Sequence, residues 1–521
     1  MESIKKLISK NAISKNILIV ILINCILAIV SLLKDIYMGA YLGTSAEADA
    51  FFLSFFIIDT IGNNLFATAL GVAVIPAFTK FFFGQRKDDV GGIFAGIIIY
   101  SIMISIIISA FLYFGRFWVV QHLGSGMSEQ WHFVGIEILV ILIPLLIVFP
   151  LINLGMGILQ SKDCFASSSV GPVVFNGVLL LGLILLYEKS VVLKEGVLLL
   201  ALFIILAVLA QLIFIWIYVI KKCRVMPDFK GIKACKTELL EIFWNFIPYF
   251  LFLATTQSIY LFERYLASGL GQGVLSGLNY AFRLVQFPIW VFIAAVSTVA
   301  FPMITRKYIS EDKEEFSRSI FSFLYVGVIF TLPLTILLYI YRVPIVNILF
   351  ERGEFTAKSS LITTTILSGY VFCIVFLGFS ALLVRVSLLQ GNKRIPLIAA
   401  FTSMIVTIIL EYVFVGLFGA VGIGYGASIG AFVNSVLLYI LLKNLLNMKI
   451  KWWKSLFPLF GSNCVLLLVS VPLGNYWSIV KSAMFMIKGG YLVVVGIISV
   501  LIYMLSFVFF KHIAEQIIDN R

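Results

Sequence analysis

The chain has 521 residues, of which 61% are hydrophobic and 12% charged, and its formal net charge is +13. Soluble globular proteins have about 45–50% apolar and about 25% charged residues, so this composition excludes a water-soluble enzyme of this size. An outer-membrane barrel is disfavoured as well, because barrel strands alternate polar and apolar residues, whereas this chain stays apolar over long runs.

Apolar runs long enough to cross a bilayer recur along the whole chain. A bilayer core needs about 20 apolar residues per helix, and about fourteen such runs occur. They cover residues 16–41, 47–79, 91–115, 132–158, 165–187, 196–220, 238–262, 273–304, 319–341, 361–388, 395–416, 423–442, 455–473 and 484–510. The first run is too long for a cleaved signal peptide and contains Lys34 and Asp35. The sequence therefore predicts an all-α polytopic membrane protein with about fourteen transmembrane helices.

Basic residues lie mainly in the short loops between these runs. With the N-terminus in the cytoplasm, Lys and Arg are roughly threefold more numerous in the cytoplasmic segments than in the outer ones, as the positive-inside rule requires. The bias persists along the chain, so we predict an even number of spans and both termini in the cytoplasm. The same loops account for the positive net charge, and no nucleic-acid partner is predicted.

Sequence signals for metal, disulfide or catalytic chemistry are missing. The six cysteines are scattered without a CxxC pair, and the three histidines (His122, His132 and His512) lie far from any cysteine pair. Neither a GxxxxGKS/T phosphate loop nor an HExxH motif occurs, and no hydrophilic stretch is long enough for a catalytic domain. We therefore predict that the protein is not an enzyme, binds no metal cofactor, and uses at most Na⁺ or H⁺ as a coupling ion.

Two short patterns recur about 230 residues apart. The second run ends in residues 76–80 (PAFTK) and the eighth in 302–306 (PMITR), while the fourth and tenth runs exit through 159–162 (LQSK) and 389–392 (LQGN). A spacing of six spans keeps both copies in one orientation, as in transporters that bind substrate between two parallel repeats and alternate access. We predict two parallel six-helix bundles plus two C-terminal helices. The predicted boundaries are 1–222, 223–448 and 449–521.

Two basic residues within the runs are candidates for binding an anion. A charge near the bilayer centre costs about 2.5–3.5 kcal/mol on insertion scales, so its presence indicates a function or a partner. Lys34 lies late in the first run and Arg283 midway along the eighth. We interpret them as facing a watery cavity between the bundles, where they attract an anionic group such as phosphate. The alternative is that each pairs internally with Asp35, Asp49 or Asp59.

Other polar and small residues in the runs have their own interpretations. Glu411 in the eleventh run is a candidate for binding a coupling ion, the alternative being a role in helix packing. Glu263 and Arg264 are interpreted as an ion pair at the outer membrane edge. Gly426 and Gly430 have the GxxxG spacing of closely packed membrane helices.

Several segments together resemble one known family. The segment SLLKDIYMGAYLGTSAEADAFFLSFF and the following VIPAFTKFF resemble the opening of MurJ (MviN) type lipid II flippases, members of the multidrug/oligosaccharidyl-lipid/polysaccharide exporter superfamily. Further similar segments are LNYAFRLVQFP, LFERGEFTA and VGIGYGASIGAFVNSVLLY. The resemblance covers essentially the whole chain in order. It implies two six-helix lobes in a V and a hydrophobic groove beside helices thirteen and fourteen for a lipid tail.

The resemblance also implies a cargo and a set of cavity residues. The cargo would be an undecaprenyl-pyrophosphate-linked sugar-peptide, and the family's cavity is lined by arginines and acidic residues. Lys34 stands at an arginine position, Asp49 at that of the aspartate after the first external loop, and Arg283 at that of the eighth-helix arginine. Lys34 and Arg283 would hold the pyrophosphate, while Asp49 would gate the site or balance its charge.

Three positions depart from what the resemblance implies. Ala28 stands where an arginine is expected, Gly62 where the second helix carries an arginine pair, and Gln286 where a glutamate is expected. The cavity would be less positive than in typical members, and Lys34 offers a point charge rather than a bidentate fork. A different lipid-linked oligosaccharide as cargo, or a divergent paralogue, therefore stays open.

The sequence as a whole predicts a bacterial inner-membrane flippase. It would move a polyprenyl-pyrophosphate-linked cell-wall precursor similar to lipid II to the outer leaflet by alternating access, driven by a cation gradient or the membrane potential. The predicted substrate-binding residues are Lys34, Asp49, Arg283 and Gln286. The predicted partners are the lipid-linked oligosaccharide, the bilayer and cell-wall synthesis proteins. The alternatives are a flippase for exopolysaccharide, capsule or teichoic-acid units and a drug/cation antiporter of the same superfamily. A membrane-embedded polymerase would need a large external loop, which the sequence lacks.

Overall fold

The structure is a computed structural model that describes residues 2–83, 90–309, 313–446 and 452–519. Within these ranges the chain forms helices and connecting turns, without a β-strand. The chain divides into two compact units, Met1–Ser276 and Gly277–Arg521. The all-α prediction is confirmed, and each of the fourteen predicted runs falls on a helix or a bent pair of helices.

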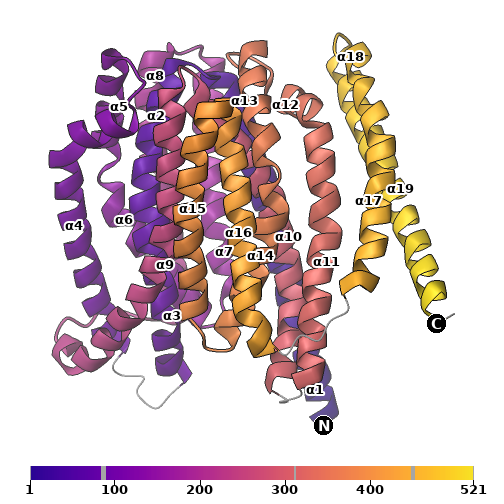
Figure 1. Ribbon diagram of the computed structural model, residues 1–521. Coiled ribbons are helices and arrows are strands. Elements are labelled where there is room, and N and C mark those ends of the chain that lie inside the picture. Colours follow the sequence, from indigo (N-terminus) through magenta and orange to yellow (C-terminus); the bar gives the residue numbers. More distant parts are fainter. Residues whose placement is uncertain (1, 84–89, 310–312, 447–451, 520–521) are drawn as a thin grey trace. The chain divides into compact units, whose positions relative to one another are not determined.

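Unit 1 contains nine α-helices and three short helices of other types among its described residues. The α-helices are α1 (Glu2–Leu42), α2 (Ala46–Ile58), α3 (Thr68–Phe83), α4 (Val90–Leu123), α5 (Glu129–Leu142), α6 (Leu145–Ser161), α7 (Phe165–Glu188), α8 (Leu193–Tyr218) and α9 (Lys236–Gly269). The short helices are the π-helices η1 (Asp59–Ala67) and η3 (Val219–Cys223) and the 3₁₀ helix η4 (Gly231–Cys235). In both units the long helices run alongside one another (Figure 1).

Unit 2 contains the remaining helices. They are α10 (Val274–Ile309), which begins just before the unit boundary, α11 (Lys313–Ile340), α12 (Arg342–Phe350), α13 (Ala357–Tyr370), α14 (Cys373–Leu389), α15 (Arg394–Phe418), α16 (Ala420–Leu446), α17 (Trp452–Asn475), α18 (Trp477–Val480) and α19 (Phe485–Asp519). Eleven helices of the described chain are long and apolar enough to cross a membrane, or thirteen if two bent pairs count as spans. A helix of 36 residues, α10, carries the eighth predicted run.

The two bent pairs are the fourth and tenth predicted runs. α5 and α6 meet at 45°, and α13 and α14 meet at 48°. The first bend coincides with Pro144, whose ring cannot continue a straight helix. Because these runs are six spans apart, the same break recurs at the same place in each predicted repeat. The broken spans therefore support the internal repeat inferred from the sequence.

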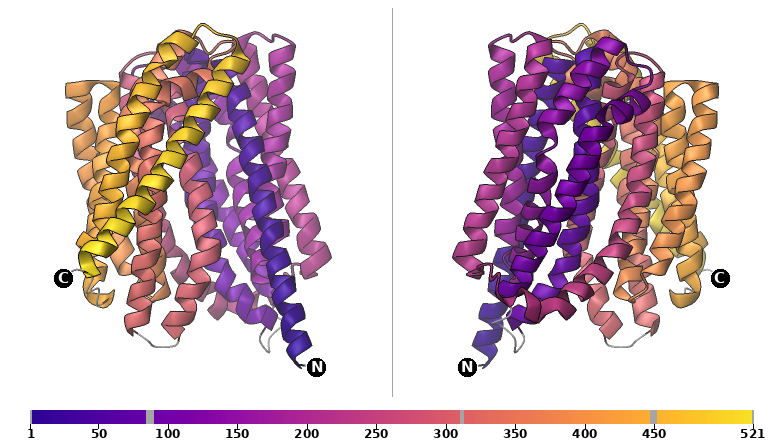
Figure 2. Two further views of the ribbon diagram at one scale, coloured as in Figure 1. Left: turned by 90° about the vertical axis from the view of Figure 1, so that its right-hand side faces the viewer. Right: turned by 90° about the vertical axis from the view of Figure 1, so that its left-hand side faces the viewer.

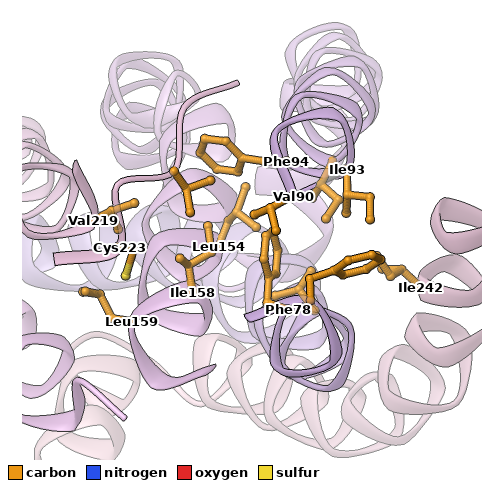
Figure 3. Close-up of a cluster of buried hydrophobic side chains, with 14 of the residues drawn as sticks. Phe78, Val90, Ile93, Phe94, Leu154, Ile158, Leu159, Val219, Cys223 and Ile242 are labelled. Atoms are coloured by element: carbon orange, nitrogen blue, oxygen red, sulfur yellow. The ribbon is translucent and has the colours of Figure 1, made fainter. Parts of the chain in front are cut away.

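The interior of unit 1 holds a cluster of fully buried apolar side chains. Phe78 of α3, Phe94 of α4 and Leu154 of α6 converge there, together with Val219 of η3 (Figure 3). The Phe78 and Phe94 ring centroids are 6.4 Å apart in an edge-to-face arrangement. Lipid tails are as apolar as these side chains, so close van der Waals packing rather than escape from water stabilises the cluster.

In unit 2, a row of glycines brings α15 and α16 into close contact. A Cβ on Gly426 would lie 2.5 Å from Glu411 Cγ, and one on Gly430 would lie 1.8 Å from Thr407 Oγ1. Glycine alone leaves room for the facing helix at these positions, as expected for a membrane GxxxG contact. The predicted close contact is confirmed, and the facing helix is α15.

The last two long helices, α17 and α19, lie side by side (Figure 2). Hydrogen bonds attach α19 to the rest of unit 2. Tyr341, between α11 and α12, shares a hydrogen bond of 3.0 Å with Ser499, and the Tyr503 hydroxyl donates to the Ile329 carbonyl at 2.9 Å. Such bonds between helices are favourable where no water can substitute for them. The predicted division into 1–222, 223–448 and 449–521 stays a prediction.

Candidate substrate and ion sites

Lys34 is buried in α1 and forms an ion pair with its neighbour in the sequence. Its Nζ lies 2.9 Å from Asp35 Oδ1, and the two side chains are 7% and 15% exposed. This is the internal pairing that the sequence left open as the alternative to cargo binding. Removal of one partner of a buried ion pair strongly destabilises the folded protein, because the other charge is left without compensation. Cargo binding by Lys34 stays a prediction.

Asp49 is buried in the first turn of α2 and binds the start of α10. Its Oδ2 accepts the N–H of Gly273 at 2.6 Å, and its Oδ1 accepts the N–H of Ser276 at 2.8 Å. The first N–H groups of a helix have no partner within the helix, and the positive end of the helix dipole favours an anion there. Both carboxylate oxygens thus have a structural role, and substrate binding by Asp49 stays a prediction.

Arg283 and Gln286 are half-buried on α10. The Trp290 indole N–H donates to Gln286 Oε1 at 2.8 Å. The Arg283 guanidinium has no hydrogen bond or ion pair with any residue in the described part of the chain. It therefore keeps its donors for an anion, which suits the predicted role. Lys34 belongs to unit 1 and Arg283 to unit 2, so their joint action on one pyrophosphate stays a prediction.

Glu411 is fully buried on α15. It lies on the face that meets α16, directly opposite Gly426. This position fits the packing alternative, because the glycine makes space for the glutamate side chain. The coupling-ion role of Glu411 stays a prediction.

The predicted pair of Glu263 and Arg264 is present near the end of α9. The Arg264 guanidinium lies 2.8 Å from Glu263 Oε2, and the two side chains are 3% and 0% exposed. Arg264 also stacks over the Phe56 ring of α2, with Cζ 4.2 Å from the ring centroid. The pair is thus buried inside unit 1 and attaches α9 to α2 through a cation–π contact.

From the sequence, Asp59 was expected only as a possible ion-pair partner of Lys34 or Arg283. In the structure it is the centre of a polar network. Asp59 Oδ1 accepts from the Asn63 amide at 3.0 Å and Oδ2 from the Asn64 amide at 2.8 Å. Asn153 of α6 donates to Asn63 Oδ1 at 3.3 Å. Asp59, Asn63 and Asn64 belong to η1, and π-turns within longer helices occur frequently at functional sites. The available signal was an Asp followed four and five residues later by Asn inside an apolar run.

Gly62 lies between these residues and faces α6. A Cβ at this position would lie 2.8 Å from Leu146 Cδ2 and 3.0 Å from Phe149 Cδ2. The segment that the resemblance associates with an arginine pair is therefore closely packed, and an arginine at Gly62 would have to displace both side chains.

Bent spans in equivalent places, charged groups within the spans and the predominance of apolar helices define a multi-pass membrane transporter. Its fold is similar to that of a solved lipid II flippase MurJ in an inward closed conformation, with a TM-score of 0.72 and 21% identity over 95% of this chain and 98% of that one. It is also similar to a multidrug resistance MATE family transporter in an inward-facing conformation, with a TM-score of 0.70 and 16% identity over 81% and 96% of the two chains.

The model of the family described as lipid II flippase MurJ matches residues 38–511, and the chain belongs to this family. A relative from Burkholderia cenocepacia, lipid II flippase MurJ, is 23% identical over 417 residues, which are 79% of this chain and 80% of the relative. The resemblance seen in the sequence is thereby confirmed.

Proposed function

We propose that this protein is a lipid II flippase, which moves a polyprenyl-pyrophosphate-linked cell-wall precursor from the inner to the outer leaflet. The family match over residues 38–511 is the observation that carries the proposal. The protein would then act by transport rather than by catalysis, in the bacterial inner membrane. The loop charges support an orientation with both termini in the cytoplasm.

The mechanism we infer is alternating access by the two repeats. Transporters with parallel repeats move one repeat relative to the other around a substrate site. Arg283 is the described residue best suited to the pyrophosphate, because its five guanidinium donors are uncommitted and guanidinium binds phosphate oxygens in a bidentate manner. Lys34 and Asp49 each have partners that would have to rearrange before they could bind cargo, whereas Gln286 uses only its amide oxygen, which accepts from Trp290.

Complementation tests this proposal directly. The gene is expressed in cells whose own lipid II flippase can be depleted, and lipid II in the outer leaflet is measured after depletion. We expect growth and outer-leaflet lipid II to be restored. Expression of folded protein in the membrane without either result would reject the lipid II assignment.

A flippase for another lipid-linked oligosaccharide is the second candidate. Two observations favour it. Lys34 is already paired with Asp35, and a closely packed glycine, Gly62, stands at a position where the resemblance implies an arginine. This candidate predicts failure of the lipid II complementation together with restored growth or polymer export in a strain lacking the flippase for a capsule, exopolysaccharide or teichoic-acid unit.

A requirement for cell-wall synthesis proteins as partners would appear as loss of transport when such proteins are depleted.

A further inference from the structure

We propose that Asp59, Asn63, Asn64 and Asn153 form a binding site for a monovalent cation, Na⁺, inside unit 1. As the site of a coupling ion it rests on the proposed transport function, but ion binding itself can be measured without transport.

Asp59 lies deep within its span. The candidate span runs from Ala46 to Phe82, and Asp59 is 13 residues from its first residue and 23 from its last. At about 1.5 Å per residue, these distances correspond to about 20 Å and about 35 Å of helix. An acidic side chain inside a membrane span is rare, and such residues mark ion pathways or pair with other groups.

No basic side chain compensates the Asp59 charge within the described ranges. The carboxylate is held only by the neutral amides of Asn63 and Asn64, one to each oxygen. Amide donors lower the energy of a carboxylate but leave its net negative charge in place. A monovalent cation would neutralise the single negative charge of Asp59, whereas a divalent cation would leave a net charge of +1.

The surrounding carboxamides can supply the remaining ligands. In this part of the structure no donor contacts Oδ1 of Asn64 or of Asn153, and Asn63 Oδ1 accepts only from Asn153. An asparagine amide presents N–H₂ or oxygen after a half-turn of its terminal group, with nearly the same shape. The Asn63 and Asn64 side chains donate N–H groups to Asp59 when no ion is bound. After the half-turn they can present their oxygen atoms to a bound Na⁺, and carbonyl oxygens are Na⁺ ligands in transporters.

The π-helix is what gathers these groups. In a π-turn the hydrogen bonds run to the fifth residue, so residues four and five positions after Asp59 both lie beside it. The Thr68 hydroxyl donates to the Asn63 carbonyl at 2.8 Å and satisfies a backbone group in the irregular segment. The neighbouring Thr60 hydroxyl is buried, and no other described group bonds to it.

Accessibility separates Asp59 from Glu411, the candidate suggested by the sequence. Glu411 is 0% exposed within the contact of α15 and α16, so an ion could reach it only if these helices parted. Asp59, Asn63, Asn64 and Asn153 are each half-buried, so none of them is enclosed in a helix contact as Glu411 is.

Binding of ²²Na⁺ to the purified full-length protein in detergent tests the site. We expect saturable binding, displaced by unlabelled NaCl and not by choline chloride. Asp59→Asn should lose it, and Asn64→Ala, which keeps the charge, should weaken it at least tenfold. Asp163→Asn is the matched control because Asp163 is exposed in a turn, and it should bind as the natural protein does. Gel filtration establishes that each variant is folded.

Two results would overturn the site. These are the absence of saturable ²²Na⁺ binding to the natural protein and retention of binding in folded Asp59→Asn; loss of binding in Glu411→Gln would then place the ion at Glu411. A protein that restores lipid II flipping but binds no Na⁺, for example because it responds to protons alone, refutes this site and leaves the proposed function standing. A protein that binds Na⁺ through Asp59 but fails complementation supports the site and refutes the lipid II assignment.

Discussion

Asp49 and Gly273 are 224 positions apart in the chain, yet the Gly273 N–H donates a hydrogen bond of 2.6 Å to Asp49 Oδ2. The second oxygen accepts the Ser276 N–H, so one carboxylate serves two amides at the start of α10. A charged cap of this kind attaches the first turn of α2 to the helix that carries Arg283. Both oxygens of Asp49 are therefore used within unit 1, at the residues that begin α10.

The first prediction concerns this cap. Asp49→Ala should destabilise the protein by about 0.5–2 kcal/mol, the usual range for loss of a helix cap. Asp49→Asn should be milder, because its amide oxygen still accepts one of the two N–H bonds. Thermal unfolding in detergent measures both. If Asp49→Ala keeps its Tm but loses flipping, the residue acts on the cargo rather than as a cap.

The second prediction concerns the Lys34–Asp35 pair. Lys34→Ala should cost up to about 3 kcal/mol, because it leaves the half-buried Asp35 charge uncompensated. The double variant Lys34→Ala, Asp35→Ala should recover most of that loss. A loss in the double variant equal to the sum of the losses in Lys34→Ala and Asp35→Ala would mean that the pair does not couple. A stable double variant that cannot flip lipid II would assign Lys34 a role with the cargo as well.

The third prediction concerns Arg283. Because its guanidinium has no partner in the described part of the chain, Arg283→Ala should leave the protein folded in the membrane while abolishing rescue of flippase-depleted cells. Arg283→Lys should retain part of the activity, since a point charge replaces a bidentate fork. The control is Arg116→Ala, whose guanidinium stacks on Tyr113 and Phe117 of α4. Normal growth with Arg283→Ala would exclude Arg283 as a cargo ligand.

The fourth prediction concerns the α15–α16 contact. Gly430→Ala should destabilise unit 2 by about 1–3 kcal/mol, as overpacking does, because its Cβ would meet Thr407 Oγ1. Adding Thr407→Ala should recover part of the loss. Gly416→Ala is the control, since a Cβ there meets nothing within 4 Å. The measurement is the Tm of each of the three variants. A Gly430→Ala protein as stable as Gly416→Ala would contradict the close contact.

The sequence alone determined the solvent, the spans and the family. Run length and composition identify membrane helices because a bilayer requires a nearly fixed number of apolar residues, whatever the surrounding fold. The Gly426–Gly430 spacing likewise predicts a close helix contact, because small residues are the local requirement for one. The broken fourth and tenth spans were not predicted, although the repeat that relates them was.

Only the tertiary structure decided what each charged residue contacts. Asp49 reaches an amide 224 positions away, Arg264 stacks on Phe56, and Asn153 joins Asp59 through Asn63. These partners depend on which helices are neighbours and on how each helix is rotated about its axis. The hydropathy of a run that is apolar on all sides does not specify that rotation. The π-turn at Asp59 is equally hidden, because a change of one residue in hydrogen-bond register leaves composition and run length unchanged. The sequence could therefore identify charges that need a partner, while the three-dimensional packing of the helices determined each partner.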